Sequence, residues 1–237
     1  MLDGLFEPNI AVAYGDPRAN WPLALPQEEA SIRHAVVKRQ GEFRAGRALA
    51  REAMAKLDLG PAPILSAEDR VPIWPDGMVG SISHCDDFCV AAVGRRADGL
   101  MAIGVDVEPA EALPEGVADE ICLADEKIWL GKLDDRERPI FERLIFCAKE
   151  SAYKCQYGVT GQLFGFDALC VHFDHARFQY EARFMRAIGP FRIGQTLFGR
   201  YVMTEKHLVT GMALGSDAFS RAGQSEIGRS GRDWPLA

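Results

Sequence analysis

Residues 103–109, Ile-Gly-Val-Asp-Val-Glu-Pro, alternate between aliphatic side chains and small or acidic ones. Successive side chains of a β-strand point to opposite faces, so the three aliphatic residues share one face, and Asp106 and Glu108 share the other. Pro109 has no N–H to offer a sheet and is expected to end the strand. The pattern predicts a strand with one core-facing side and one acidic side.

Two carboxylates held side by side repel each other unless a proton or a cation lies between them. Mg²⁺ prefers oxygen ligands of this kind, usually one or two carboxylates together with water and substrate phosphate. Asp106 and Glu108 are therefore candidate magnesium ligands. The alternative is an ordinary half-buried edge strand whose acidic face meets solvent.

The composition is that of a globular protein with an acidic surface. The chain has 237 residues, 48% of them hydrophobic, and a formal net charge of −7. This charge disfavours nucleic-acid binding, and an anionic ligand would have to meet a local basic cluster. No apolar run reaches the roughly 18 residues that suggest a membrane-spanning helix, and the first residues lack a signal-peptide pattern. The six cysteines form no C-x-x-C pair and are expected to be reduced, as in a cytoplasmic protein. We also expect the protein to be a monomer.

The first half of the chain has mixed helix and strand signals. We expect a strand at 9–14, a helix from Pro26, a helix at 38–57, and a hairpin of 88–93 with the strand ending at Glu108.

Two polar clusters stand out in this half. The helix at 38–57 carries Arg44, Arg47 and Arg51, which form either an anion site or an ordinary solvated face. Residues 80–84, Gly-Ser-Ile-Ser-His, bring backbone N–H groups, hydroxyls and an imidazole into a segment able to contact phosphate. Taken alone, His84 is equally well explained as an ordinary loop histidine.

The second half begins with helical patterns and ends with strands. We expect helices at 118–130 and 136–157, and strands at 167–174, 177–187, 197–203 and 207–214, the last two joined as a hairpin.

The helix at 136–157 has an apolar core stripe, and Glu150 and Lys154 lie one turn apart on the nearly opposite face. An exposed ion pair at this spacing contributes only about 0.2–0.5 kcal/mol. Because Phe146 and Tyr153 flank the pair, we favour a partly buried, functional face over this alternative.

These elements predict an α+β fold in two halves, each an antiparallel sheet packed with helices. The acidic stretch at 109–119 marks the boundary between them. We expect an N-terminal domain at 1–110, a C-terminal domain at 111–215 and a mobile tail at 216–237.

Four separated motifs together resemble one enzyme family. They are Lys38-Arg39-x-x-Glu42-Phe43-x-x-Gly46-Arg47, Trp74-Pro-Asp-Gly-x-x-Gly-Ser-x-Ser-His84, Gly104-x-Asp-x-Glu108 and Phe146-Cys-Ala-Lys-Glu-Ser-Ala-Tyr-Lys154. In this order and spacing they are similar to the surfactin/enterobactin-type 4′-phosphopantetheinyl transferases, closest to the enterobactin branch. The resemblance spans about residues 35–170.

The resemblance implies an enzyme that moves 4′-phosphopantetheine from coenzyme A to a serine of an apo acyl or peptidyl carrier protein, as a holo-carrier-protein synthase. It implies Mg²⁺ as cofactor, adenosine 3′,5′-bisphosphate as the second product, and two similar halves related by a pseudo-twofold axis with the active site between them. The branch suggests siderophore or other nonribosomal peptide synthesis, with polyketide carriers as an alternative.

Carried onto this chain, the resemblance implies a site assembled from both halves. The implied metal ligands are Asp106, Glu108 and Glu150, and the implied contacts to coenzyme A phosphates are Arg39, Arg47, Ser83, His84 and Lys154. Arg70 is the candidate for one further basic contact to coenzyme A, unless Ser66 occupies that position.

The base for the carrier serine has two candidates, Glu150, which we prefer, and Glu126. Lys149, within the Lys-Glu motif, is expected to have a structural or phosphate-orienting role. An acidic carrier would need a basic patch, for which Lys127, Lys132, Arg136 and Arg138 are the candidates.

Two rival functions use the same residues. Carboxylates with Lys and His also suit a metal-dependent pyrophosphate hydrolase, and a chain that had lost transfer would be a coenzyme A-binding module.

Overall fold

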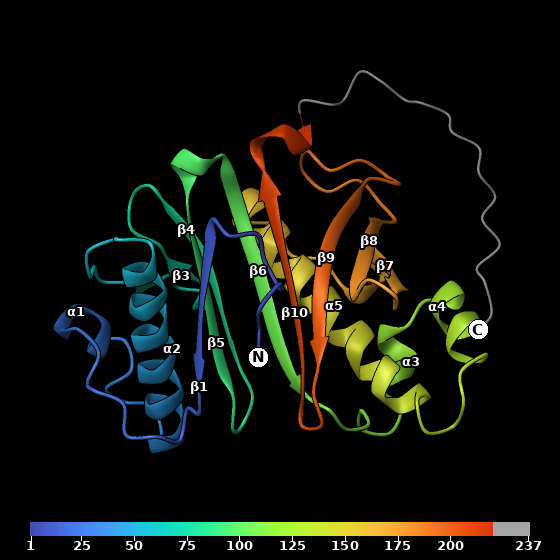
Figure 1. The fold of residues 1–237 in the computed structure, drawn as a ribbon, viewed down its shortest axis with the longest axis horizontal. Helices are drawn as coiled ribbons and strands as arrows, with labels where there is room; N and C mark the ends of the chain where they lie inside the picture. Colours follow the sequence, from blue (N-terminus) through green and yellow to red (C-terminus); the bar gives the residue numbers. More distant parts are fainter. Residues whose placement is uncertain (220–237) are drawn as a thin grey trace.

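Two long helices lie on the outer sides of two antiparallel sheets in the computed structural model, which describes residues 1–219 (Figure 1). The predicted tail lies almost wholly outside the described residues, and its first four form a short 3₁₀ helix, η3 (Ser216–Phe219). Within residues 1–219, none of the helices is both long enough and apolar enough to cross a membrane.

The N-terminal elements come in the predicted order. They are β1 (Ile10–Gly15), α1 (Pro26–Glu29), α2 (Val37–Lys56), β2 (Leu65–Ser66), β3 (Pro72–Ile73), β4 (Met78–His84), β5 (Cys89–Arg95), η1 (Arg96–Asp98) and β6 (Leu100–Pro109).

The C-terminal elements are helices followed by strands. They are α3 (Val117–Ile121), α4 (Ala124–Leu130), α5 (Arg138–Thr160), η2 (Phe166–Ala168), β7 (Leu169–Asp174), β8 (Gln179–Phe184), β9 (Thr196–Met203) and β10 (His207–Gly215).

The strands form a three-stranded sheet, β1-β5-β4, a five-stranded sheet, β6-β10-β9-β8-β7, and the small pair β2-β3, with every pairing antiparallel. This confirms the predicted α+β class and the predicted β9–β10 hairpin. The pseudo-twofold relation of the halves and the domain boundary at 110/111 stay predictions.

The predicted hairpin between β5 and β6 is wrong. β5 is the central strand of its sheet, so β1 and β4 already occupy both of its edges. β6 pairs instead with β10, where Asp106 lies opposite Thr210 and Val107 opposite Val209. The short connection through Gly99 therefore passes the chain from one sheet to the other rather than closing a hairpin.

The predicted helix at 118–130 is interrupted. Cys122 has an extended backbone, and α4 starts afresh after Leu123, whose N–H donates to the side chain of Glu126. Residues 124–130 are helical as expected, but the direction of the chain changes before them.

The alternation at 103–109 places its two faces as predicted. Ile103, Val105 and Val107 are buried against the three-stranded sheet, among side chains such as Val90 and Ala92 of β5. The opposite face of β6 meets α5. Four layers result, in the order α2, three-stranded sheet, five-stranded sheet and α5 (Figure 1). The alternative of a solvated acidic face is wrong, because Asp106 is 3% exposed.

Gly104 allows α5 to lie against β6. A Cβ atom added at Gly104 would stand 1.8 Å from the carbonyl oxygen of Ser151 in α5, which is far inside van der Waals contact. The obstacle is helix backbone, which cannot rotate away as a side chain could. The approach of α5 to the acidic face of β6 therefore requires glycine at this position.

We predict that Gly104→Ala destabilises the protein by about 3 kcal/mol, at the upper end of the usual cost of overpacking, because α5 must move away from β6. Urea unfolding measures the change. Gly60→Ala is the matched control, since a Cβ at Gly60 meets nothing within 4 Å and its φ is not left-handed. Equal stability of the two variants would contradict the proposed close approach.

Candidate functional site

Asp106 lies where three elements meet. Its Oδ1 atom accepts a hydrogen bond from the Ser83 hydroxyl of β4 at 2.7 Å and pairs with Lys154 Nζ of α5 at 2.6 Å. Lys154 Nζ also donates to Ser83 Oγ at 3.0 Å and to the carbonyl of Val105 at 3.3 Å. Three residues predicted from separate motifs are thus in direct contact.

The two sheets are joined at this point through side chains. The N–H of Val105 donates to the Ser81 hydroxyl at 3.1 Å. Because β6 is an edge strand, this side chain of β4 satisfies a backbone N–H that no neighbouring strand reaches. Ser81 and Ser83 lie two residues apart and therefore on the same side of β4. Both are buried.

Glu108 is held by an arginine that the sequence analysis did not single out. Arg143 of α5 donates to Glu108 Oε2 at 2.9 Å, and also to the carbonyl oxygens of Glu111 and Ala112. Burial raises the pKa of Glu108 to about 7, the Asp106 charge adds to the rise, and Arg143 opposes it. Arg143 precedes Glu150 by seven residues, two helical turns on the same face, which is the signal that could have found it.

Glu150 completes an acidic cluster. Burial raises its pKa, the nearby charge of Asp106 raises it further, and Lys154 opposes the rise. Burial also disfavours the Lys154 charge, but Asp106 outweighs this and raises the pKa of Lys154 above its usual value. Asp106 thus lies close enough to Glu108 and to Glu150 for its charge to act on both.

The cluster has an acceptor that no protein donor satisfies. Among residues 1–219, Asp106 Oδ2 is the only buried side-chain nitrogen or oxygen without a hydrogen-bond partner. A buried unsatisfied acceptor costs roughly 1–3 kcal/mol, so a group that binds there would be favoured. A free carboxylate oxygen beside two further carboxylates fits a hard divalent cation such as Mg²⁺.

A cavity of about 870 Å³ opens beside this cluster. Glu150, Lys154 and Ser81 line it together with Tyr153 of α5 and Trp74 of the turn before β4. Arg70 also lines it, with the left-handed backbone (φ 70°) of its loop. Its volume is that of a small-molecule or cofactor site. Tyr157 of α5 donates a short hydrogen bond to Asp69 across its wall.

His84 follows Ser83 and pairs with the basic helix. Arg39 NH1 lies 2.9 Å from His84 Nε2, and because a guanidinium can only donate, Nε2 is the acceptor in this contact. Burial lowers the pKa of His84; Arg39 and Lys154 contribute to the fall, and Glu42 opposes it. Arg39 keeps a 43% exposed side chain and remains accessible to an anion.

Arg47 points away from solvent. Its guanidinium donates to the carbonyls of Ile64 and Leu65 and to the Ser66 hydroxyl, and it lies 4.4 Å from the centre of the Phe43 ring. Burial lowers the pKa of Arg47 to about 10. These contacts hold the segment at 64–66 against α2.

Glu126 lies in the core of the C-terminal half. It pairs with Lys149 at 2.8 Å and accepts the N–H groups of Leu123 and Val171. Lys149 also donates to the carbonyls of Ile121 and Phe166, and both charged side chains are at most 1% exposed. The structure does not bring Glu126 into contact with Asp106 or Lys154.

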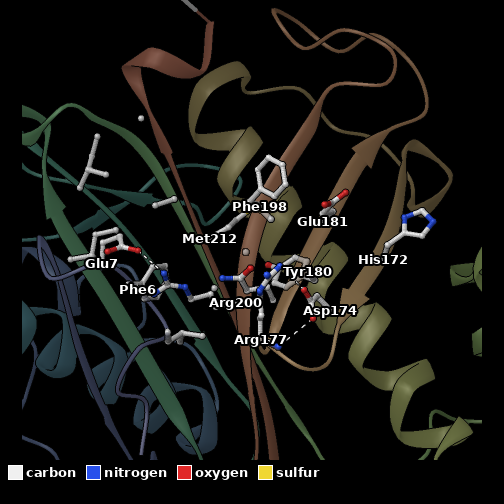
Figure 2. Close-up of a pocket in the computed structure, with 18 of the residues that line it drawn as sticks. Phe6, Glu7, His172, Asp174, Arg177, Tyr180, Glu181, Phe198, Arg200 and Met212 are labelled. Atoms are coloured by element: carbon white, nitrogen blue, oxygen red, sulfur yellow. Dashed lines mark hydrogen bonds and ion pairs between the residues drawn. The ribbon is translucent and has the colours of Figure 1, made fainter. Parts of the chain in front are cut away.

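A larger cavity, of about 1120 Å³, contains none of the predicted site residues (Figure 2). It lies on the face of the five-stranded sheet that turns away from α5, where β8 and β9 extend beyond the three-stranded sheet. Four of its charged side chains pair with each other, Arg200 with Glu7 at 2.6 Å and Arg177 with Asp174 at 3.3 Å. We therefore place the functional site at the smaller cavity.

Comparison with known proteins matches both halves of the chain. Residues 27–94 match the 4′-phosphopantetheinyl transferase N-terminal domain, and residues 102–204 match the 4′-phosphopantetheinyl transferase superfamily. The chain is 39% identical to 4′-phosphopantetheinyl transferase PptT of Mycobacterium tuberculosis over 213 residues, 86% of this chain and 91% of that protein.

Two further relatives extend the comparison. The chain is 38% identical to 4′-phosphopantetheinyl transferase Svp of Streptomyces mobaraensis over 200 residues, 83% of this chain and 80% of that one. It is 34% identical to enterobactin synthase component D of Salmonella typhi over 148 residues, 62% of this chain and 59% of that one.

We predict that Glu126→Ala costs about 3–5 kcal/mol of stability, because it leaves Lys149 buried without its charge partner. Replacing both residues by apolar ones, Glu126→Leu with Lys149→Met, should recover part of that loss, since no unpaired charge remains, but the N–H groups of Leu123 and Val171 still lack their acceptor. Denaturant unfolding of the variants measures both effects. A Glu126→Ala variant that kept full stability would instead favour a chemical role for this carboxylate.

Proposed function

Because the chain belongs to the 4′-phosphopantetheinyl transferase superfamily, we propose that it transfers 4′-phosphopantetheine from coenzyme A to a serine of an apo carrier protein, with Mg²⁺ as cofactor. The observation that carries this proposal is the cluster of Asp106, Lys154 and Glu150 beside the 870 Å³ cavity, with one Asp106 oxygen lacking a donor. The second product is adenosine 3′,5′-bisphosphate.

Asp106, Glu108 and Glu150 would hold the magnesium ion. When bound, Mg²⁺ neutralises negative charge on the pyrophosphate of coenzyme A and on the leaving phosphate. Burial raises the pKa values of Glu108 and Glu150, and the Asp106 charge adds to both rises; a bound cation would favour the charged form of each carboxylate, which supports this assignment.

Lys154 and Ser83 orient the ligand cluster and face the pyrophosphate. Lys154 already fixes Asp106 Oδ1 at 2.6 Å and extends from there to the cavity wall. His84 and the exposed Arg39 form a second polar pair for a phosphate of coenzyme A, and Arg70 a third contact at the cavity. We assign Arg47 to supporting the 3′-phosphate site through the segment at 64–66.

Glu150 is the proposed general base. Glu150 lines the cavity proposed to hold the pyrophosphate, whereas Glu126 does not, so Glu150 is the carboxylate placed to reach the proton of the carrier serine. The carrier serine oxygen forms a bond to the β-phosphorus of coenzyme A, its proton passes to Glu150, and the bond from that phosphorus to the bridging oxygen breaks. Glu126 is already fully engaged with Lys149 and two backbone N–H groups, which supports Glu150 over Glu126.

The carrier protein is proposed to dock as an acidic partner of a cytoplasmic, monomeric enzyme. Of the four candidate docking residues, Lys127 pairs with Asp119 and Arg138 with Asp135, both on the surface. Carriers of nonribosomal peptide, siderophore or polyketide synthesis are the proposed substrates.

Incubation of the protein with coenzyme A, Mg²⁺ and an apo carrier protein tests the function by mass spectrometry. Transfer predicts that the carrier serine gains the mass of one phosphopantetheine. Free phosphopantetheine without any carrier would identify a pyrophosphate hydrolase instead, and binding of coenzyme A without either product would identify a binding module.

We predict that Asp106→Asn lowers kcat by more than about a hundredfold, because it removes a charged ligand of the magnesium ion. The rise in thermal midpoint that Mg²⁺ and coenzyme A give the wild type should also be lost. Asp125→Asn, at a surface carboxylate, is the control and should keep both properties. A variant at position 106 that stayed fully active would remove the metal assignment.

Arg70→Ala is predicted to raise the KM for coenzyme A several-fold while leaving kcat unchanged, the pattern of a lost binding contact. Steady-state kinetics with varied coenzyme A measures it, with Arg192→Ala as a control at an exposed arginine outside the cavity. An unchanged KM would exclude Arg70 from the binding site.

A further inference from the structure

The tips of two hairpins, one from each sheet, meet close to the candidate active site. The turn between β4 and β5 supplies Cys85 and Asp87, and His207 opens β10 directly after the β9–β10 turn. His207 Nε2 lies 2.7 Å from Asp87 Oδ1, and Cys85 Sγ lies 3.7 Å from the same oxygen. A thiol, a carboxylate and an imidazole thus converge, with all three ligand-type atoms within 4.8 Å of one another.

Both turns are fixed by their own hydrogen bonds. The N–H of Cys85 donates to the carbonyl of Phe88 at 2.8 Å, which closes the β4–β5 turn. On the other side, the Thr204 hydroxyl accepts the N–H of His207 at 2.9 Å, and the Thr204 N–H donates to the His207 carbonyl. The Phe88 ring also packs against the His207 ring, with centroids 4.8 Å apart. The three side chains are therefore held in place before any ligand arrives.

A simple ion pair accounts for only part of this arrangement. It explains His207, which is 8% exposed, and its contact with Asp87. It does not explain why the half-buried thiol of Cys85 faces the same carboxylate oxygen. The other five cysteines are fully buried and have no comparable partner set among residues 1–219.

We propose that Cys85, Asp87 and His207 form a binding site for Zn²⁺, separate from the magnesium site. Thiolate and imidazole ligands favour zinc over Mg²⁺, whereas the all-carboxylate cluster at Asp106 has the opposite preference.

Zinc bond lengths of about 2.0–2.3 Å at tetrahedral angles place ligand atoms about 3.3–3.5 Å apart. The Cys85–Asp87 separation of 3.7 Å is near this value, and the His207–Asp87 pair at 2.7 Å needs to open by roughly 0.6–0.8 Å. On binding, His207 carries its proton on Nδ1 and offers the Nε2 lone pair to the ion in place of the hydrogen bond to Asp87. The Cys85 thiol releases its proton to solvent, and water takes the fourth position.

Zinc at this point would cross-link the two sheets. The β4–β5 turn belongs to the three-stranded sheet and His207 to the five-stranded sheet, so a bound ion adds a bond between them. Cys85 directly follows His84, so the same bond would hold the end of β4 beside the phosphate-binding pair. A zinc ion bound here would therefore stabilise the contact between the two sheets beside the candidate active site.

Titration of the metal-free, full-length protein with Co²⁺ tests the proposal, because a cobalt–thiolate bond gives a charge-transfer absorption band that carboxylate ligands do not give. We expect this band at one Co²⁺ per chain and its loss on addition of one Zn²⁺. Cys85→Ser should abolish the band, and His207→Gln should weaken metal binding by at least about a hundredfold. Cys170→Ala and His34→Gln, at a buried thiol and an exposed imidazole outside the cluster, should bind as the wild type does.

Thermal unfolding provides a second readout that does not depend on the band. Zn²⁺ should raise the midpoint of the wild type and of Asp106→Asn, but not that of Cys85→Ser. A wild type without a cobalt–thiolate band, or Cys85→Ser and His207→Gln variants that bind Zn²⁺ as tightly as the wild type, would overturn the proposal. Loss of the band in Asp106→Asn would also overturn it, by assigning the ion to the carboxylate cluster. No carrier or coenzyme A is present, so these outcomes are independent of the transferase proposal.

Discussion

The contact between Asp106 of β6 and Lys154 of α5 is the interaction at which the two sheets and the long helix α5 meet. The same carboxylate oxygen accepts the Ser83 hydroxyl, so one atom joins α5, the edge of the five-stranded sheet and the edge of the three-stranded sheet. Loss of one partner of a buried ion pair is costly because the remaining charge is neither paired nor hydrated. The contact is possible because Gly104, one step along the same face, leaves room for the backbone of α5.

The two halves use the same kind of anchor for their long helices. In each, a fully buried glutamate from a short helix pairs with a basic residue of the long helix, Glu28 with Arg51 and Glu126 with Lys149. Each glutamate also accepts the N–H of the residue three positions before it and one N–H from a distant segment. These two carboxylates, with all of their oxygens hydrogen-bonded, hold the long helices in position, because loss of a basic partner would leave an unpaired buried charge.

Asp106 differs from Glu28 and Glu126 in that one of its carboxylate oxygens is left without a hydrogen-bond donor. Glu28 and Glu126 have all of their oxygens engaged with protein donors, whereas Oδ2 of Asp106 has none. The charges around it are also unbalanced locally: the neighbouring carboxylates Glu108 and Glu150 both have raised pKa values, although basic side chains lie within reach. The chain has a net charge of −7, and a cation bound together with an anionic ligand would offset the repulsion among the carboxylates around Asp106.

Much of the local structure was predictable from sequence, because it depends on periodicity. The period of two at 103–109 correctly separated the aliphatic and acidic faces of β6, and the period of 3.6 placed Glu150 and Lys154 on one side of α5. Four motifs in order gave the family. The same local patterns did not reveal that Arg143 binds Glu108, although its spacing from Glu150 carried the signal.

The sequence by itself determined which residues share a strand face or a helix face, because those relations follow from backbone geometry over a few residues. Only the tertiary structure decided which faces meet. A strand pattern does not specify its partner, so β6 was assigned to the neighbouring β5 when its actual partner, β10, lies about a hundred residues further along. For the same reason the burial of Glu126 with Lys149, and the meeting of Cys85 with His207, follow from long-range packing that no local pattern encodes.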